Sequence, residues 1–228
     1  WPTTFVKVQI LQKQEYTNKK TVFTERQGND LKVKVLIDDH SAIQLGSVTG
    51  MVDKVYWNDE GTALILSLDW QSPIGIADAY AYRVDLEKQT LEAVLLNDED
   101  HQGVTVIGVT PDFQRMLFVK YYGFDRSVWL GGISTGTESK TNLVSPPLDY
   151  QWLSNNILIG VGSFDDMYST QVYIYDLGKN IGKLVGAGSI NVERNRANSA
   201  LISPNLESVA FIEEDSEIPF LVRCYKYR

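Results

Sequence analysis

Short runs of alternating apolar and polar residues, separated by polar turns, recur along the whole chain. The stretch 149–185 contains four such runs, at 150–153, 157–162, 171–176 and 184–185. Alternation with a period of two indicates a strand that is buried on one face. Clusters of Ser, Asn, Asp and Gly between the runs are typical of tight turns. Four runs joined in this way predict a four-stranded antiparallel sheet.

Five consecutive segments share this pattern. The turn after the first strand of each segment is expected near Thr17, Asn58, Pro111, Ser154 and Pro204, at spacings of 41 to 53 residues. Four-stranded repeats of this length are typical of β-propellers. We therefore predict an all-β fold, a single β-propeller domain over residues 1–228 with about five four-stranded antiparallel blades. The blades are expected at about 5–48, 52–97, 104–144, 148–187 and 198–228.

The ends of the chain leave two arrangements open. The fifth segment stops after its third predicted strand, and only residues 3–7 offer a strand to complete that sheet. The stretch 3–16, however, reads as one long strand without an internal turn. The alternatives are a closed five-bladed ring and a piece of a larger ring. Because the sequence starts at Trp1, we expect either a processed protein or part of a longer chain.

Charge and cysteine content narrow the class of partner. The net charge of -8 and the pI near 4.8 disfavour nucleic acid and anionic membranes as partners. No apolar run is long enough to cross a bilayer. Cys224 is the only cysteine, so an intrachain disulfide and a multi-cysteine metal site are both excluded. We expect a protein, peptide or glycan partner, and no cofactor.

Two segments carry a recognisable turn. Thr110-Pro111-Asp112-Phe113 precedes the apolar run 116–119, and Ser203-Pro204-Asn205-Leu206 precedes the run 209–212. Both resemble the Ser-Pro-Asp-Gly turn of TolB-type, WD40-like propeller repeats, although neither has the complete motif. The Gly-His and Trp-Asp pairs of WD40 repeats do not occur at the corresponding positions. The resemblance implies the fold and says little about activity, because propellers carry many unrelated functions.

A candidate binding face follows from the predicted blades. In a propeller, the loops between second and third strands lie on the same face as the connections between blades, here including 97–101 and 189–198. Those loops combine aromatic and acidic residues, as expected for a hydrated recognition surface. The alternative is that the aromatic rings cap the blades and the acids are only solvated. The candidate ligand contacts are Trp70, Tyr121, Tyr122, Phe124, Asp125, Phe164, Asp165, Asp166, Tyr168 and Asp215.

The other tryptophans are predicted to be structural. Trp57 and Trp152 end first strands, and Trp129 lies within a third strand. These positions favour packing between blades.

Sequence patterns that suggest catalysis or metal binding have simpler explanations. Gly132-Ile133-Ser134-Thr135-Gly136 has the spacing of a nucleophile elbow, but it falls at a predicted hairpin and no helix follows it. The runs 38–40 and 98–101 combine acids with His40 and His101 but lack the spacing of a metal site. The acids at 165–166 and 213–215 lack a calcium-loop motif. We therefore predict no catalytic and no metal-binding residues.

One enzymatic alternative remains. Asp38, Asp85 and Asp176 recur at the ends of third strands, and some five-bladed propellers are glycoside hydrolases that use paired carboxylates. Repeated acids, however, usually fix a repeated turn, whereas a catalytic set differs between blades. We predict a non-catalytic recognition or scaffolding module in the periplasm or outside the cell, with any signal peptide already removed. The alternative is the propeller part of a hydrolase, either a peptidase-gating domain or a five-bladed glycoside hydrolase.

Overall fold

The computed structural model describes residues 20–27, 30–37, 41–69, 79–96, 103–123, 125–163, 169–185, 192–193, 197–205, 208–213 and 221–226. Within these ranges the regular elements are all β-strands and no helix occurs. The strands are β1 (Lys20–Gln27), β2 (Asp30–Ile37), β3 (Ser41–Thr49), β4 (Met51–Trp57), β5 (Ala63–Asp69), β6 (Ala79–Asp85), β7 (Thr90–Leu96), β8 (Gly103–Val109), β9 (Arg115–Tyr122), β10 (Asp125–Gly132), β11 (Glu138–Lys140), β12 (Asp149–Trp152), β13 (Ile157–Gly162), β14 (Ser169–Asp176), β15 (Ile181–Leu184), β16 (Val192–Glu193), β17 (Ala197–Ile202), β18 (Ser208–Glu213) and β19 (Leu221–Lys226).

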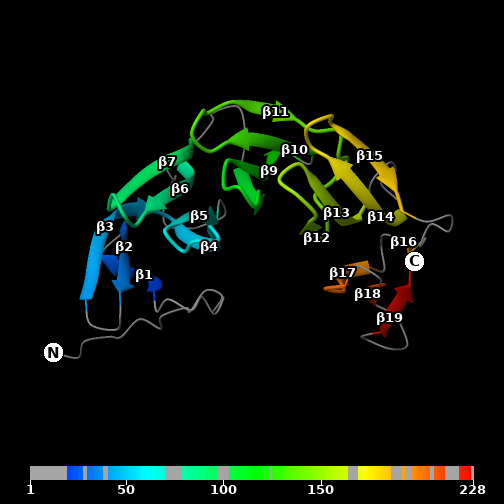
Figure 1. The fold of residues 1–228 in the computed structure, drawn as a ribbon, viewed down its shortest axis with the longest axis horizontal. Helices are drawn as coiled ribbons and strands as arrows, with labels where there is room; N and C mark the ends of the chain where they lie inside the picture. The colour runs from blue at the N-terminus through cyan, green and yellow to red at the C-terminus, as the bar shows by residue number, and fades with distance from the viewer. Residues whose placement is uncertain are drawn as a thin grey trace. The chain divides into compact units, whose positions relative to one another are not determined.

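The described strands form five antiparallel sheets in which consecutive strands pair, except that β16 pairs with β14 (Figure 1). Three sheets contain a run of four consecutive strands, β4 to β7, β8 to β11 and β12 to β15. The sheets β1-β2-β3 and β17-β18-β19 have three described strands each. The all-β class and the repeated antiparallel sheet are therefore confirmed. The stretch 3–16, the only candidate for completing the last sheet, lies outside the described residues.

One connection differs from the prediction. The polar stretch 189–198 was expected to be an irregular link, but it contains β16, which pairs with the start of β14, and the first residues of β17. A two-residue strand is too short to produce a periodic pattern, so alternation could not reveal it.

The chain divides into two compact units. The first contains β1 to β8 together with Phe113–Met116 and Gly132–Thr137. The second contains Thr110–Asp112, Leu117–Gly131 and the strands from β11 onward.

Strand β5 is the centre of the first unit's core. Its residues from Ala63 to Leu68 are buried on both faces of the sheet. Leu64, Leu66 and Leu68 pack in one cluster with apolar residues of β2 and β3. Trp57 lies half-buried against the same cluster, which contains residues of both sheets.

The second unit is packed around buried aromatic side chains of β9 and β14. Phe118, Tyr173 and Tyr175 are fully buried. Burial raises the pKa of Tyr173 far above its ordinary value, so its hydroxyl stays protonated. Two of these rings require a glycine on the neighbouring strand, because a Cβ at Gly131 would meet the Phe118 ring and one at Gly160 would meet the Tyr173 ring.

The first residues of three predicted turns hold those turns with their side chains. Asn58 Oδ1 accepts hydrogen bonds from the backbone N–H groups of Thr62 and Ala63, both at 2.9 Å. The Ser154 and Ser203 hydroxyls likewise accept backbone N–H groups beyond their turns, at 3.2 Å from Ile157 and 3.0 Å from Ser208. Small polar side chains that satisfy the local backbone are the reason these residues recur at turns.

We expect Asn58→Ala to lower the free energy of unfolding by about 1–2 kcal/mol, because the buried Ala63 N–H loses its acceptor. Urea denaturation measures the change. Asp59→Ala, at an exposed position in the same turn, is the matched control and should stay within about 0.5 kcal/mol of the parent protein. Equal stability of the two variants would contradict the role given to Asn58.

Candidate functional site

Three of the ten predicted contact residues lie within the described part of the chain. Tyr121 and Tyr122 are the last residues of β9, and Asp125 is the first residue of β10. The other seven fall outside the described residues: Trp70, Phe124, Phe164, Asp165, Asp166, Tyr168 and Asp215.

The hairpin between β9 and β10 is tighter than predicted. Residues 121–126 were expected to form a loop, but the two strands extend to Tyr122 and from Asp125, which leaves only residues 123 and 124 as the connection. Gly123 has a φ of 58°, in the left-handed region that glycine adopts without strain. Tyr122 and Asp125 are therefore held on paired strands rather than on a loop.

The two tyrosines differ in exposure. The Tyr122 residue is 66% exposed, whereas Tyr121 is half-buried. Asp125 and Arg126 on the facing strand are both exposed. The hairpin end thus presents one large aromatic ring beside an acid and a base.

A buried cation connects the three strands below this hairpin end. The Lys120 side chain on β9 is only 7% exposed, and its Nζ lies 2.7 Å from Glu138 Oε2 on β11. The same Nζ lies 4.8 Å from the centre of the Trp129 ring on β10, a cation–π distance. The Trp129 Nε1–H donates to the Ser127 hydroxyl at 2.8 Å. Lys120 therefore fixes the positions of β10 and β11 next to the exposed Tyr122.

Trp129 and Trp152 have partners within their own sheets, and these contacts leave the predicted packing between blades as a prediction. The described contacts of Trp129 lie within its own sheet rather than between blades. Trp152 also has a partner on its own strand, the Tyr150 ring, in an edge-on arrangement at 5.6 Å. A strand residue can pack within its sheet or against the next one, and the sequence does not distinguish the two.

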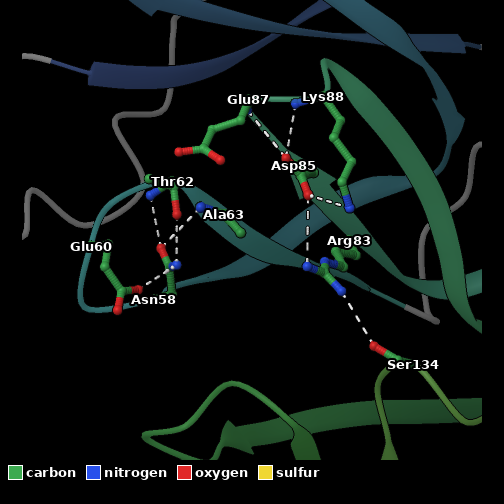
Figure 2. Close-up of polar contacts among 9 residues, drawn as sticks. All are labelled: Asn58, Glu60, Thr62, Ala63, Arg83, Asp85, Glu87, Lys88 and Ser134. Atoms are coloured by element: carbon green, nitrogen blue, oxygen red, sulfur yellow. Dashed lines mark hydrogen bonds and ion pairs between the residues drawn. The ribbon is translucent and has the colours of Figure 1, made fainter.

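The repeated acids at the ends of third strands fix turns. Asp85 Oδ1 accepts hydrogen bonds from the backbone N–H groups of Glu87 and Lys88, at 3.2 and 3.0 Å, and Oδ2 lies 3.4 Å from Lys88 Nζ (Figure 2). The Lys88 backbone hydrogen bond, with help from the lysine side chain and its charge, lowers the pKa of Asp85.

Asp176 repeats this arrangement in the second unit. Its Oδ1 accepts the Lys179 backbone N–H at 3.1 Å, and its Oδ2 lies 3.0 Å from Lys179 Nζ. Hydrogen bonds from the Lys179 side chain and backbone lower the pKa of Asp176. Both carboxylates are used by their own turns, as the recurrence predicted. Asp38 lies outside the described residues.

The Gly132–Gly136 segment is the hairpin turn between β10 and β11. The Gly132 N–H donates to Thr137 O at 2.8 Å, and the Gly136 N–H donates to Gly132 O at 3.2 Å. Gly136 has a φ of 64°. The prediction of a turn instead of a nucleophile elbow is confirmed, since an elbow requires a strand followed by a helix.

Comparisons with known proteins identify the architecture. No protein-family model matches the sequence, and no curated protein matches it. Solved structures do match: TolB from Acinetobacter baumannii superposes with a TM-score of 0.53 and 13% identity, over 92% of this chain and 49% of TolB. The chain has the fold of a TolB-type β-propeller.

Enzymes with the same propeller fold are equally similar. An oligogalacturonate lyase from Vibrio parahaemolyticus gives a TM-score of 0.55 at 13% identity, over 92% of this chain and 63% of the lyase. A prolyl endopeptidase gives 0.56 at 12% identity, over 91% of this chain and 32% of the peptidase. The propeller chain thus spans between a third and two thirds of these proteins. At such identities the similarity concerns the fold alone.

The described part of the propeller contains no metal-ligand cluster of three or more His, Cys, Asp or Glu residues. It also contains no helix that is long and apolar enough to span a membrane. The acid and histidine runs at 38–40 and 98–101 lie outside the described residues.

Sequence reasoning missed Arg83 and Lys120. Arg83 occupies β6, where it extends toward the turn that carries Ser134 (Figure 2). Lys120 follows four buried residues of β9 and is itself buried. The signal in the sequence was in each case a charged residue within a mostly apolar strand. Such a residue is informative because a charge at a buried position requires a partner.

Proposed function

We propose that this propeller is a non-catalytic recognition or scaffolding module that binds a protein, peptide or glycan through an acidic, aromatic face. The observation that carries the proposal is Tyr122, an aromatic residue that is 66% exposed at the end of the β9–β10 hairpin. Rigid aromatic side chains on a preorganised scaffold supply contact area at a small entropic cost. The face is proposed to include the other nine predicted contacts.

The charge of the chain supports the choice of partner. The net charge of -8 disfavours a nucleic-acid backbone as the partner. Asp125 beside Tyr122 can accept hydrogen bonds from a peptide backbone or a sugar hydroxyl, while the ring packs on an apolar side chain or a sugar face. A location outside the cytoplasm belongs to the same proposal and is supported by the likeness to TolB.

Substituting Tyr122 tests this proposal. Tyr122→Ser should weaken the binding of any ligand that uses the hairpin by about tenfold, the usual effect of losing a central aromatic contact. A peptide array and an oligosaccharide array supply the probes, and the best binder on either is titrated against both variants by calorimetry. Leu96→Ser, at an equally exposed residue, is the matched control and should leave the affinity unchanged.

Two results would count against the proposal. No binder on either array would remove the recognition function. Equal affinity of the parent protein and Tyr122→Ser would move the site away from the β9–β10 hairpin.

The alternative is the propeller part of a hydrolase or lyase. Its support is that propellers of the same fold occur in a prolyl endopeptidase and an oligogalacturonate lyase, of which this chain spans 32% and 63%. Incubation with proline-containing peptides and with oligogalacturonates, followed by product analysis, separates the two functions. Product formation that depends on the propeller chain would favour the enzyme.

A further inference from the structure

Arg83 carries a positive charge into the middle of a mostly buried strand. In the register of the second sheet it lies between Ile65 on β5 and Glu92 on β7. Its side chain is 28% exposed and reaches the turn between β10 and β11, where Nη1 lies 3.3 Å from Ser134 Oγ (Figure 2). The guanidinium therefore lies where two turns of the first unit meet.

The hydrogen-bonding capacity of this guanidinium is largely unused by the described residues. A guanidinium has five N–H donors. Among the described residues it makes one hydrogen bond, to Ser134, and its buried Nε has no acceptor. The ion pair with Asp85, at 3.7 Å between Nη2 and Oδ2, is longer than a hydrogen bond. Arg–carboxylate pairs are frequently bidentate, with two short hydrogen bonds, and the pair of Arg83 with Asp85 is not.

Asp85 does not fill that role because it is occupied elsewhere. Its Oδ1 accepts two backbone N–H groups of its own turn, and Oδ2 is shared with Lys88 Nζ at 3.4 Å. Glu87 directs its carboxylate away from Arg83 (Figure 2). Glu92, the cross-strand neighbour, is exposed, and no ion pair joins it to Arg83 within the described residues. Arg83 and Lys88 thus share the Asp85 carboxylate, which already accepts two hydrogen bonds within its own turn.

Two further donors near Arg83 belong to exposed residues, Ser134 and Lys88. Ser134 is exposed, and because its oxygen accepts from Arg83, its own O–H can donate outward. The Lys88 side chain is 72% exposed and can turn from Asp85 toward a second anion. A guanidinium, a hydroxyl and an ammonium are donors that recognise a carboxylate or phosphate group.

We propose that Arg83, Ser134 and Lys88 form a binding site for one oxyanion group of a ligand, either a carboxylate or a phosphate. The Nη1 and Nη2 edge of Arg83 binds two oxygens of the group, the Ser134 hydroxyl donates to one of them, and Lys88 balances the charge. The site uses no residue of the β9–β10 hairpin, so it is independent of the proposed recognition face.

Titration with inorganic phosphate and with acetate tests the site, at constant ionic strength maintained with sodium chloride. The readout is the ¹⁵N–¹H signal of the Arg83 Nε, followed by nuclear magnetic resonance and assigned by its loss in Arg83→Gln, together with calorimetric affinity. A saturable shift with phosphate alone, with acetate alone or with both supports the site and identifies its preferred group. If neither phosphate nor acetate produces a saturable shift, the proposal is overturned.

Single substitutions test which residues bind the anion. Arg83→Gln should weaken anion affinity by at least about tenfold, and Ser134→Ala by about threefold to tenfold, as expected for losing charge-assisted hydrogen bonds. Arg126→Gln, at an exposed arginine on β10, is the matched control and should bind as the parent protein does. Should Arg83→Gln fail to fold, Ser134→Ala on its exposed turn still tests the site. The assignment would be overturned if Ser134→Ala bound the anion as tightly as the parent protein. It would also be overturned if Arg126→Gln lost as much anion affinity as Arg83→Gln.

The test also separates this site from the recognition face. Tyr122→Ser should retain the anion response, because Tyr122 contributes no donor to it.

Discussion

Gly160→Ala is expected to lower the free energy of unfolding by about 3 kcal/mol, the upper part of the range for overpacking a core. A Cβ at Gly160 would lie 2.7 to 2.8 Å from two ring atoms and the hydroxyl oxygen of Tyr173, which faces it across the β13–β14 pair. Tyr173 is fully buried, so the ring cannot move aside without shifting its neighbours. Urea unfolding followed by circular dichroism measures the loss.

Gly178→Ala is the matched control on the same sheet. A Cβ there has its nearest neighbour at 3.4 Å, so stability should change by less than about 1 kcal/mol. In the double variant Gly160→Ala/Tyr173→Val the ring is absent, and the alanine should add almost nothing to the cost of Tyr173→Val alone. An unchanged unfolding midpoint for Gly160→Ala would show that the two strands separate more easily than the structure indicates.

Glu138→Ala should also destabilise the protein strongly, by about 2–3 kcal/mol. The substitution removes the Glu138 carboxylate from the buried Lys120 ammonium, which also lies near the aromatic rings of Trp129 and Phe118. Breaking a fully buried ion pair by removing one partner costs about 3–5 kcal/mol, and the 32% exposure of the Glu138 side chain reduces that figure. Thermal and urea unfolding give the difference.

The reverse substitution should cost less. Lys120→Met keeps most of the buried stem and leaves Glu138, which reaches solvent, with its charge hydrated. The double variant Lys120→Met/Glu138→Leu should therefore be more stable than Glu138→Ala. Lys140→Met, at an exposed position on the same short strand, is the control and should stay within about 0.5 kcal/mol of the parent protein. If Lys120→Met lowered the stability more than Glu138→Ala, a partner of the ammonium other than Glu138 would contribute more to the stability.

Local features of the sequence predicted most of the strands. Runs such as Ile157–Gly162 and Ala79–Asp85 are strands at the predicted bounds, because alternation and β-branched residues act within a single segment. The turns beginning at Asn58, Ser154 and Ser203 were equally predictable, since each side chain satisfies the backbone a few residues away. The recurrence of such turns then indicated the propeller.

The candidate site was less predictable. Residues 121–126 have the composition of a loop, and pairing between β9 and β10 shortens that loop to a two-residue connection. Strand pairing across a tight hairpin outweighs the low strand preference of Asp125, whereas Tyr121 and Tyr122 favour strands. The exposure of Tyr122 and the burial of Lys120, two residues apart on one strand, likewise depend on what packs against each.

The amino-acid order by itself determined that this chain forms short antiparallel strands repeated about five times, because period-two alternation and turn chemistry are local properties. Only the tertiary structure decided which charges meet: Lys120 with Glu138 and Trp129, and Arg83 with Ser134 fifty-one residues away. Such pairs form because strands distant in sequence bring a buried charge to the group that can compensate it. No pattern of residues along the chain predicts which distant residues come into contact.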